Sequence, residues 1–137
     1  MVDSIPDNKG MVMEAVRTKI RVLSELPGFE RVRFIMLYGS ALTMGTGSDI
    51  DLCIYFEGNR EESSRFRMQA LSLPGTDLFD IQIFSQLPLY VRMEVLKGEV
   101  VFYRDLRFVY ETAVSTLRDF EMFRHRLDDY TGEKAIT

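Results

Sequence analysis

The sequence predicts an α/β (α+β) fold, in which helices flank a small mixed β-sheet and a long helix ends the chain. Two observations carry this prediction: apolar residues recur at spacings of three and four in some segments, and short β-branched and aromatic runs separate those segments. A third observation concerns domain number, since no Pro-, Gly- or Ser-rich linker and no repeat interrupts the 137 residues. We therefore expect a single domain over residues 1–137.

Helical spacing predicts four helices. They cover residues 11–26, 59–73, 88–97 and 104–130. Pro27-Gly28, Pro74-Gly75 and Gly98 end the first three. The fourth would measure about 40 Å at 1.5 Å per residue, which exceeds the diameter of so small a domain. Its distal apolar stripe therefore either packs on the sheet or docks a partner. That stripe contains Phe120, Phe123, Leu127 and Tyr130.

Four other runs predict β-strands. They cover residues 31–38, 49–56, 78–84 and 99–103. The second run alternates, so its apolar residues share one face and its acidic residues share the other. The apolar face contains Ile50, Leu52, Ile54 and Phe56, and the other face contains Asp49, Asp51, Cys53 and Tyr55. We expect the first face to join the core and the second to carry charge.

The composition describes an ordinary globular chain, with 46% hydrophobic and 28% charged residues. A chain of this length buries about two-thirds of its unfolded surface, so it needs no disulfide or structural metal, in agreement with its single cysteine, Cys53. The 17 Lys and Arg against 21 Asp and Glu give a net charge of -4 and no bulk attraction to phosphates. A nucleotide must therefore be held by a local site, and long nucleic acid is not an expected partner.

Nothing in the sequence indicates a membrane or export. No stretch approaches the roughly 18 continuous apolar residues that a membrane span needs, and the first ten residues lack a secretory pattern. One unpaired cysteine suits a reducing compartment. We therefore expect a cytoplasmic protein with no membrane partner.

Acidic residues on two predicted strands form the first part of a candidate site. Asp49 and Asp51 project from one face of a strand, about 7 Å apart at Cα, so a divalent cation can bind between them. Asp80 lies between Phe79 and Ile81 and shares a polar face with Gln82. If the two strands are neighbours, Asp80 lies beside Asp51 and supplies the third carboxylate of a two-metal site.

The residues between the first two strands form the second part. Gly39 permits a sharp turn and a close approach to a ligand, and Ser40 offers a hydroxyl and an N–H at the start of a short helix expected over residues 41–44. Gly45 and Gly47 loosen the return, and Ser48 can bond the backbone beside the aspartates. Together these residues would cradle a triphosphate beside the carboxylates.

Competing sites fail on the same residues. Gly45 is followed by Thr46, so there is no phosphate-loop Gly-Lys-Ser/Thr, and no Gly-x-Gly-x-x-Gly occurs. Cys53 stands where a calcium loop needs an oxygen ligand. His125 is the only histidine and lies on the polar side of the last helix, which argues against zinc or Ser-His catalysis.

Three basic residues are the nearest candidates for a cation that meets the triphosphate. They are Arg92 and Lys97 on the short third helix and Arg104 after Tyr103. The alternative for each is an ordinary solvated charge, because every exposed helix carries such residues.

This ordered pattern resembles the minimal nucleotidyltransferase branch of the DNA polymerase β-like nucleotidyltransferase superfamily. The branch has a hydrophobic strand, Gly-Ser, a glycine-containing loop, Ser-Asp-hydrophobic-Asp-hydrophobic, and a later strand aspartate before a short helix. These parts are residues 34–38, Gly39-Ser40, Gly45 and Gly47, residues 48–52, residues 79–81 and residues 88–98. The resemblance covers most of the chain. It departs from the branch in a shortened loop between Ser40 and Asp49.

The resemblance implies a polymerase β-like fold and an enzyme that moves AMP from ATP onto an acceptor hydroxyl, with two Mg²⁺ ions as cofactors. It makes Asp49, Asp51 and Asp80 the catalytic and metal-binding residues. It makes Gly39, Ser40 and Ser48 the nucleotide-binding residues. Members of this size commonly act as antitoxins, and their partner is a HEPN-family ribonuclease toxin encoded nearby, whose tyrosine receives AMP.

Other functions stay open at this point. The chain could be a non-catalytic antitoxin that neutralises its partner by occlusion, or a nucleotidyltransferase that acts on RNA or on a small molecule. Association as a homodimer or hetero-oligomer is also open. An acidic chain with an overhanging amphipathic helix fits a basic RNA-cutting partner, since opposite charges attract.

Overall fold

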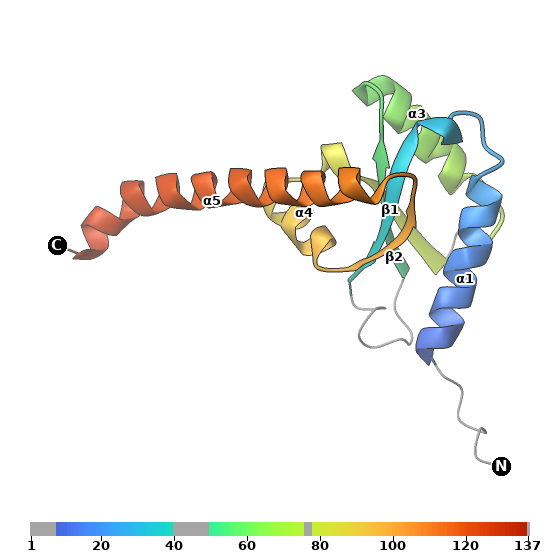
Figure 1. Ribbon diagram of the computed structural model, residues 1–137, viewed down its shortest axis with the longest axis horizontal. Coiled ribbons are helices and arrows are strands. Elements are labelled where there is room, and N and C mark those ends of the chain that lie inside the picture. The colour runs from blue at the N-terminus through green and yellow to red at the C-terminus, as the bar shows by residue number, and fades with distance from the viewer. Residues whose placement is uncertain (1–7, 40–49, 76–77, 137) are drawn as a thin grey trace, which may run out of the picture.

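A four-stranded mixed β-sheet forms the centre of the molecule (Figure 1). The structure is a computed structural model that describes residues 8–39, 50–75 and 78–136. The strands are β1 (Val32–Tyr38), β2 (Ile50–Phe56), β3 (Phe79–Ile83) and β4 (Glu99–Tyr103), in the order β3-β2-β1-β4. β1 runs antiparallel to β2 and β4, whereas β2 and β3 are parallel. The mixed sheet expected from the sequence is therefore confirmed.

Helices cover both faces of this sheet. They are α1 (Asn8–Leu23), α3 (Arg60–Leu71), α4 (Leu89–Leu96) and α5 (Leu106–Ile136), with the 3-10 turns η2 (Phe29–Arg31) and η4 (Phe84–Gln86) between them. α1 and α3 pack on one face, where Val16, Leu23 and Phe66 join the inward residues of the strands. α4 and the start of α5 pack on the other face, where Val95 and Val109 meet Phe34.

The second face of β2 differs from the expectation. Cys53 is 1% exposed and belongs to a second apolar cluster with Phe34, Met36 and Phe84. Only the beginning of the strand carries charge on this face, at Asp51. The alternation within β2 is as predicted, but α4 and α5 supply a second apolar layer that turns most of the expected charged face into core.

The helix boundaries shift where turns intervene. α1 ends at Leu23, three residues before the predicted end, because residues 24–28 form a turn whose Gly28 has φ +94°. Leu26 still packs on the core, so its apolar character reflects burial of the turn. α3 begins after Asn59, whose side chain accepts from the N–H of Glu62 while the Glu62 carboxylate accepts from the N–H of Asn59. This capping box satisfies two of the free donors at the helix start.

The last helix is longer than predicted and extends well beyond the sheet (Figure 1). Its 31 residues span about 46 Å. Val109 and Thr116 are buried against the domain, whereas Leu117, Phe123 and Leu127 are each about half exposed. The first turns therefore complete the core and the later turns carry an apolar stripe away from it. Within the described residues, no helix is long and apolar enough to cross a membrane.

Candidate active site

Two of the predicted carboxylates lie side by side on neighbouring strands. β2 and β3 are parallel and in a register that places Asp51 opposite Asp80. Neighbouring strands lie about 4.8 Å apart, and residues in register project from the same face of the sheet. The antiparallel register of β1 puts Tyr38 on the other side of Asp51. Asp51, Asp80 and the end of β1 therefore meet at one end of the sheet, which we call the aspartate end.

Gly39 makes room for one of these carboxylates. Its φ is +85°, a conformation that side chains other than glycine adopt reluctantly. A Cβ atom built on Gly39 would collide with Oδ2 of Asp51 and lie 3.1 Å from its Cγ. The carboxylate of Asp51 therefore occupies the space that any other residue would fill at position 39. The sequence predicts a close approach at Gly39, and the structure shows that the Asp51 side chain makes it.

The Asp80 carboxylate accepts a hydrogen bond from the next polar residue of its strand. Nε2 of Gln82 donates to Oδ1 of Asp80 at 3.0 Å. Both side chains are partly buried, and no ion pair in the described part of the chain involves Asp80. The sequence places Gln82 on the same face as Asp80, but it does not foresee this contact, because alternation fixes the face and not the rotamer.

Tyr38 is a further residue of this end. Burial raises the pKa of its hydroxyl, and the negative charges of Asp51 and Asp80 raise it further. Burial also raises the pKa of the Cys53 thiol, which keeps that group neutral. Tyr38 is not among the site residues predicted from the sequence, although its position directly before Gly39 could have indicated it. Its phenol is therefore uncharged and lies near the two carboxylates.

The other predicted site residues fall outside the described residues. These are Ser40, Ser48 and Asp49, together with Gly45, Gly47 and the short helix expected over residues 41–44. Their roles remain predictions. In the part of the chain that the structure describes, no group of three or more His, Cys, Asp or Glu side chains could hold a metal ion. Asp51 and Asp80 contribute two carboxylates, and the third predicted carboxylate, Asp49, is not among the described residues.

The donor set at the aspartate end fits a divalent cation. Carboxylate oxygens are the ligands that Mg²⁺ prefers, and the two residues that carry them lie in register on neighbouring strands of the sheet. The space beside the Gly39 backbone is filled by the Asp51 carboxylate, which therefore lies close to the end of β1. The residues present therefore suit the metal that the sequence predicts.

Each of the three basic candidates contacts a group other than the aspartates. Nε of Arg92 donates to the carbonyl of Leu87 at 3.1 Å, and Nζ of Lys97 lies 2.9 Å from Oε2 of Glu94. Arg104 donates to the carbonyl of Val32, the first residue of β1, so it lies at the end of the sheet opposite the aspartates. The hypothesis that Arg104 meets the triphosphate is therefore wrong for this arrangement.

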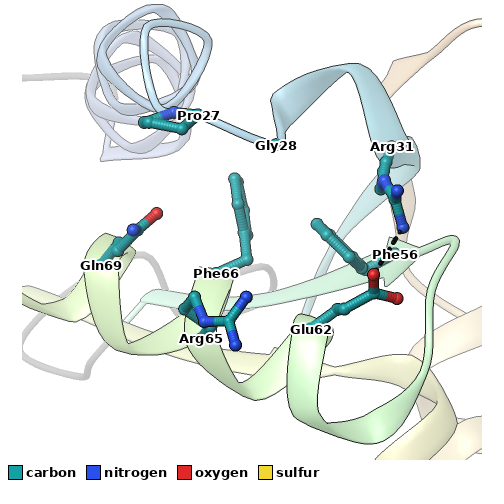
Figure 2. A pocket seen from close by; sticks show the side chains of 8 residues that line it. All are labelled: Pro27, Gly28, Arg31, Phe56, Glu62, Arg65, Phe66 and Gln69. Atoms are coloured by element: carbon teal, nitrogen blue, oxygen red, sulfur yellow. Dashed lines mark ion pairs between the residues drawn. The ribbon is translucent and has the colours of Figure 1, made fainter.

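A cavity at that opposite end has a different character (Figure 2). It has a volume of about 240 Å³, and Phe56 and Phe66 point into it. Arg31 and Glu62 close one side of it with an ion pair of 3.1 Å. None of the predicted site residues lines it. The cavity is thus separate from the carboxylates, which remain the candidate site.

Comparison with known families identifies this arrangement. The family described as Polymerase beta, Nucleotidyltransferase matches residues 20–107, which contain the sheet, Gly39, Asp51 and Asp80. The chain belongs to this nucleotidyltransferase family. No curated protein matches the chain in sequence. The polymerase β-like fold expected from the sequence is thereby confirmed.

Solved structures with the nucleotidyltransferase fold align over most of the chain. A chain of the toxin–antitoxin MntA-HepT is 12% identical with a TM-score of 0.61, covering 93% of this chain and 99% of that one. A chain of the tri-AMPylated Shewanella oneidensis HEPN toxin in complex with MNT antitoxin is 13% identical with a TM-score of 0.62, covering 94% and 99%. A toxin–antitoxin with AMP-PNP gives 16% identity and a TM-score of 0.62, covering 88% and 98%. At these identities the likeness concerns the fold.

Proposed function

We propose that this nucleotidyltransferase transfers AMP from ATP to an acceptor hydroxyl at the aspartate end. The observation that carries the proposal is the register that sets Asp51 against Asp80, with Gly39 making room for the first carboxylate. Two adjacent carboxylates repel each other, so their juxtaposition is favourable when a cation lies between them. Membership of the nucleotidyltransferase family supplies the reaction class.

The mechanism assigns a task to each residue of the site. Asp51 and Asp80 hold Mg²⁺ from neighbouring strands, and Asp49 joins them from its sequence position two residues before Asp51. Bound Mg²⁺ supplies neutralisation of the triphosphate and of the pyrophosphate leaving group. Ser40 and Ser48 donate hydrogen bonds to phosphate oxygens. The rigid sheet aligns the acceptor hydroxyl with the α-phosphate, and positioning of this kind is the main source of rate acceleration in phosphoryl transfer.

The acceptor that we propose is a tyrosine hydroxyl of a HEPN-family toxin encoded nearby, so that AMP transfer silences the toxin. Two observations support this choice. Three solved structures with this fold are toxin–antitoxin assemblies, and one of them contains a tri-AMPylated HEPN toxin. The distal part of α5 also presents an apolar stripe, with Leu117, Phe123 and Leu127 each about half exposed. An exposed stripe of this kind suits docking of a helical partner.

The test is transfer of label from α-phosphate-labelled ATP. The purified chain is incubated with Mg²⁺ and the helical protein encoded next to it, and the label is located by gel, protease and nuclease digestion. We expect protein-bound label on the partner and at least a hundredfold loss in the Asp51→Asn variant, because the metal ligand becomes a neutral amide. Glu25→Gln, an exposed carboxylate-to-amide change in the turn after α1, should transfer at the normal rate.

Other outcomes decide between the remaining functions. Nuclease-sensitive label would move the acceptor to RNA. Inhibition of the partner by both wild type and Asp51→Asn, with no label, would establish neutralisation by occlusion and contradict the proposal.

A further inference from the structure

Gln82 is a polar residue at the boundary between the aspartate end and the apolar core. In the register of β2 and β3, Asp80 lies opposite Asp51, and Gln82 lies opposite Cys53, which is 1% exposed. The same cluster continues through Phe34 and Phe84. An apolar side chain would suit this position, so the partly buried amide needs a reason, and its contact supplies one.

The contact has one chemically consistent orientation. An ionised carboxylate only accepts hydrogen bonds, so the amide nitrogen of Gln82 and not its oxygen must face Asp80. Nε2 donates to Oδ1 at 3.0 Å, and this bond to a charged acceptor is stronger than a bond between neutral groups. The bond fixes the rotation of the carboxylate about its Cβ–Cγ axis. Among the described residues, Oδ2 accepts no hydrogen bond, and the Asp80 side chain projects from the face shared with Asp51.

We propose that Gln82 is a positioning residue for the transfer reaction and acts through Asp80. The inference rests on the proposed function, since it assigns to Gln82 the orientation of a metal-binding carboxylate. Partners that orient metal ligands typically contribute tenfold to a hundredfold to metal affinity or activity. Because an amide stays neutral, it restrains Asp80 without adding charge to a site that must accept a cation.

The test compares three variants with the wild type. Gln82→Met keeps the shape of the side chain without the donor, and Gln82→Glu keeps the shape and adds a repelling charge. Gln86→Met is the matched control, because Gln86 donates to Ser63 and Ser64, away from the carboxylates. Mn²⁺ affinity is measured by electron paramagnetic resonance on protein saturated with a non-hydrolysable ATP analogue. Thermal melting, kcat and KM for ATP are measured on the same samples.

We expect Gln82→Met to weaken Mn²⁺ binding and lower kcat by about tenfold, with KM for ATP and the melting temperature nearly unchanged. Gln82→Glu should lose more, and Gln86→Met should match the wild type. A purely structural role would move the melting temperature and leave Mn²⁺ affinity alone. If Gln82→Met does not fold, Gln82→Asn carries the same test, because its shorter amide cannot make the contact.

Mn²⁺ binding by the Asp51→Asn variant tests the proposed function separately from the role of Gln82. Loss of Mn²⁺ binding in Asp51→Asn, with wild-type affinity and kcat in a folded Gln82→Met, would overturn the role of Gln82 alone. Mn²⁺ binding that Asp51→Asn does not alter would overturn the proposed function and the role of Gln82 together.

Discussion

The two ends of the β-sheet treat charge in opposite ways. At the end where β1 begins, the guanidinium of Arg104 donates to the carbonyls of Val32 at 2.7 Å and Phe29 at 2.8 Å. The ring centroids of Phe29 and Phe102 lie 5.3 and 5.2 Å from its Cζ atom. At the aspartate end, two like charges lie side by side, and the donor to Asp80 within the described residues is the neutral amide of Gln82.

Under the proposed function, this difference separates a charge that supports the fold from charges that bind a ligand. The contacts of Arg104 tie β4 to the turn before β1 and favour the folded state by themselves. Two adjacent carboxylates repel each other, and this repulsion by itself disfavours the folded state. If the aspartate end is the site of transfer, as we propose, substitutions at the two ends of the sheet should differ in their effects on stability and on activity.

The largest expected effect comes from Gly39→Ala at the aspartate end. The new Cβ would collide with the Asp51 carboxylate. The alanine would also have to adopt a φ of +85°, which strains the backbone of any L residue. We expect the free energy of unfolding to fall by about 2–4 kcal/mol and AMP transfer by the folded fraction to fall at least tenfold. Urea unfolding and labelled-ATP transfer measure the two effects.

Gly75→Ala is the control for that substitution. Gly75 has φ +78°, but a Cβ there meets nothing within 4 Å. It should lose about 1 kcal/mol from backbone strain and keep full transfer activity. Equal effects of the two substitutions would mean that the Asp51 carboxylate does not depend on the space beside Gly39.

Arg104→Met should show the reverse pattern at the opposite end. It removes two hydrogen bonds to backbone carbonyls while keeping an apolar stem between the rings, so the free energy of unfolding should fall by about 1–3 kcal/mol. Transfer by the folded protein should be unchanged, and so should KM for ATP. A rise in KM for ATP at unchanged stability would indicate that Arg104 binds the triphosphate, contrary to its position at the opposite end of the sheet.

Lys19→Met has the smallest expected effect. It tests whether a buried charge near the aspartate end contributes to AMP transfer or only to stability. Lys19 is 5% exposed, and its Nζ has no hydrogen-bond partner among the described residues. It lies 5.4 Å from the ring centroid of Phe79, next to Asp80. Because methionine keeps the apolar volume and removes the buried charge, we expect about 1 kcal/mol of added stability with unchanged transfer.

The buried lysine should also make the stability of the wild type depend on pH. Burial lowers the pKa of Lys19 below its ordinary 10.5, so the unfolded chain binds the proton more tightly than the folded chain. Wild-type stability should therefore rise as the pH increases from the folded pKa toward 10.5, and Lys19→Met should lose this rise. A loss of AMP transfer in Lys19→Met would show instead that this lysine acts on the site from the other face of the sheet.

Alternation within single strands predicts much of the aspartate end. The face shared by Asp51 and Cys53, and the face shared by Asp80 and Gln82, follow from a period of two. Asp51 and Asp80 lie side by side only because β2 and β3 are neighbours, and the sequence does not show which strands are neighbours. The hydrogen bond from Gln82 and the contact of Gly39 with Asp51 depend on rotamers and strand register, which no local pattern encodes.

Longer-range packing accounts for the other differences. The apolar layer over Cys53 comes from α4 and α5, more than thirty residues further along the chain, so the β2 pattern cannot reveal it. Arg104 looks like a solvated charge in sequence because its partners are backbone carbonyls, which leave no residue-type signal. The roles of Ser40, Ser48 and Asp49 remain predictions from sequence.

The first turns of α5, which pack on the domain, affect how a partner would bind to the later turns that project from it. An isolated helix must first form a turn at considerable entropic cost, and short helices are marginal in water for that reason. Here Val109 and Thr116 hold the first turns on the domain, so the later turns need only propagate an existing helix. The projecting half is thereby preorganised, and a partner that docks on it loses little affinity to ordering the chain.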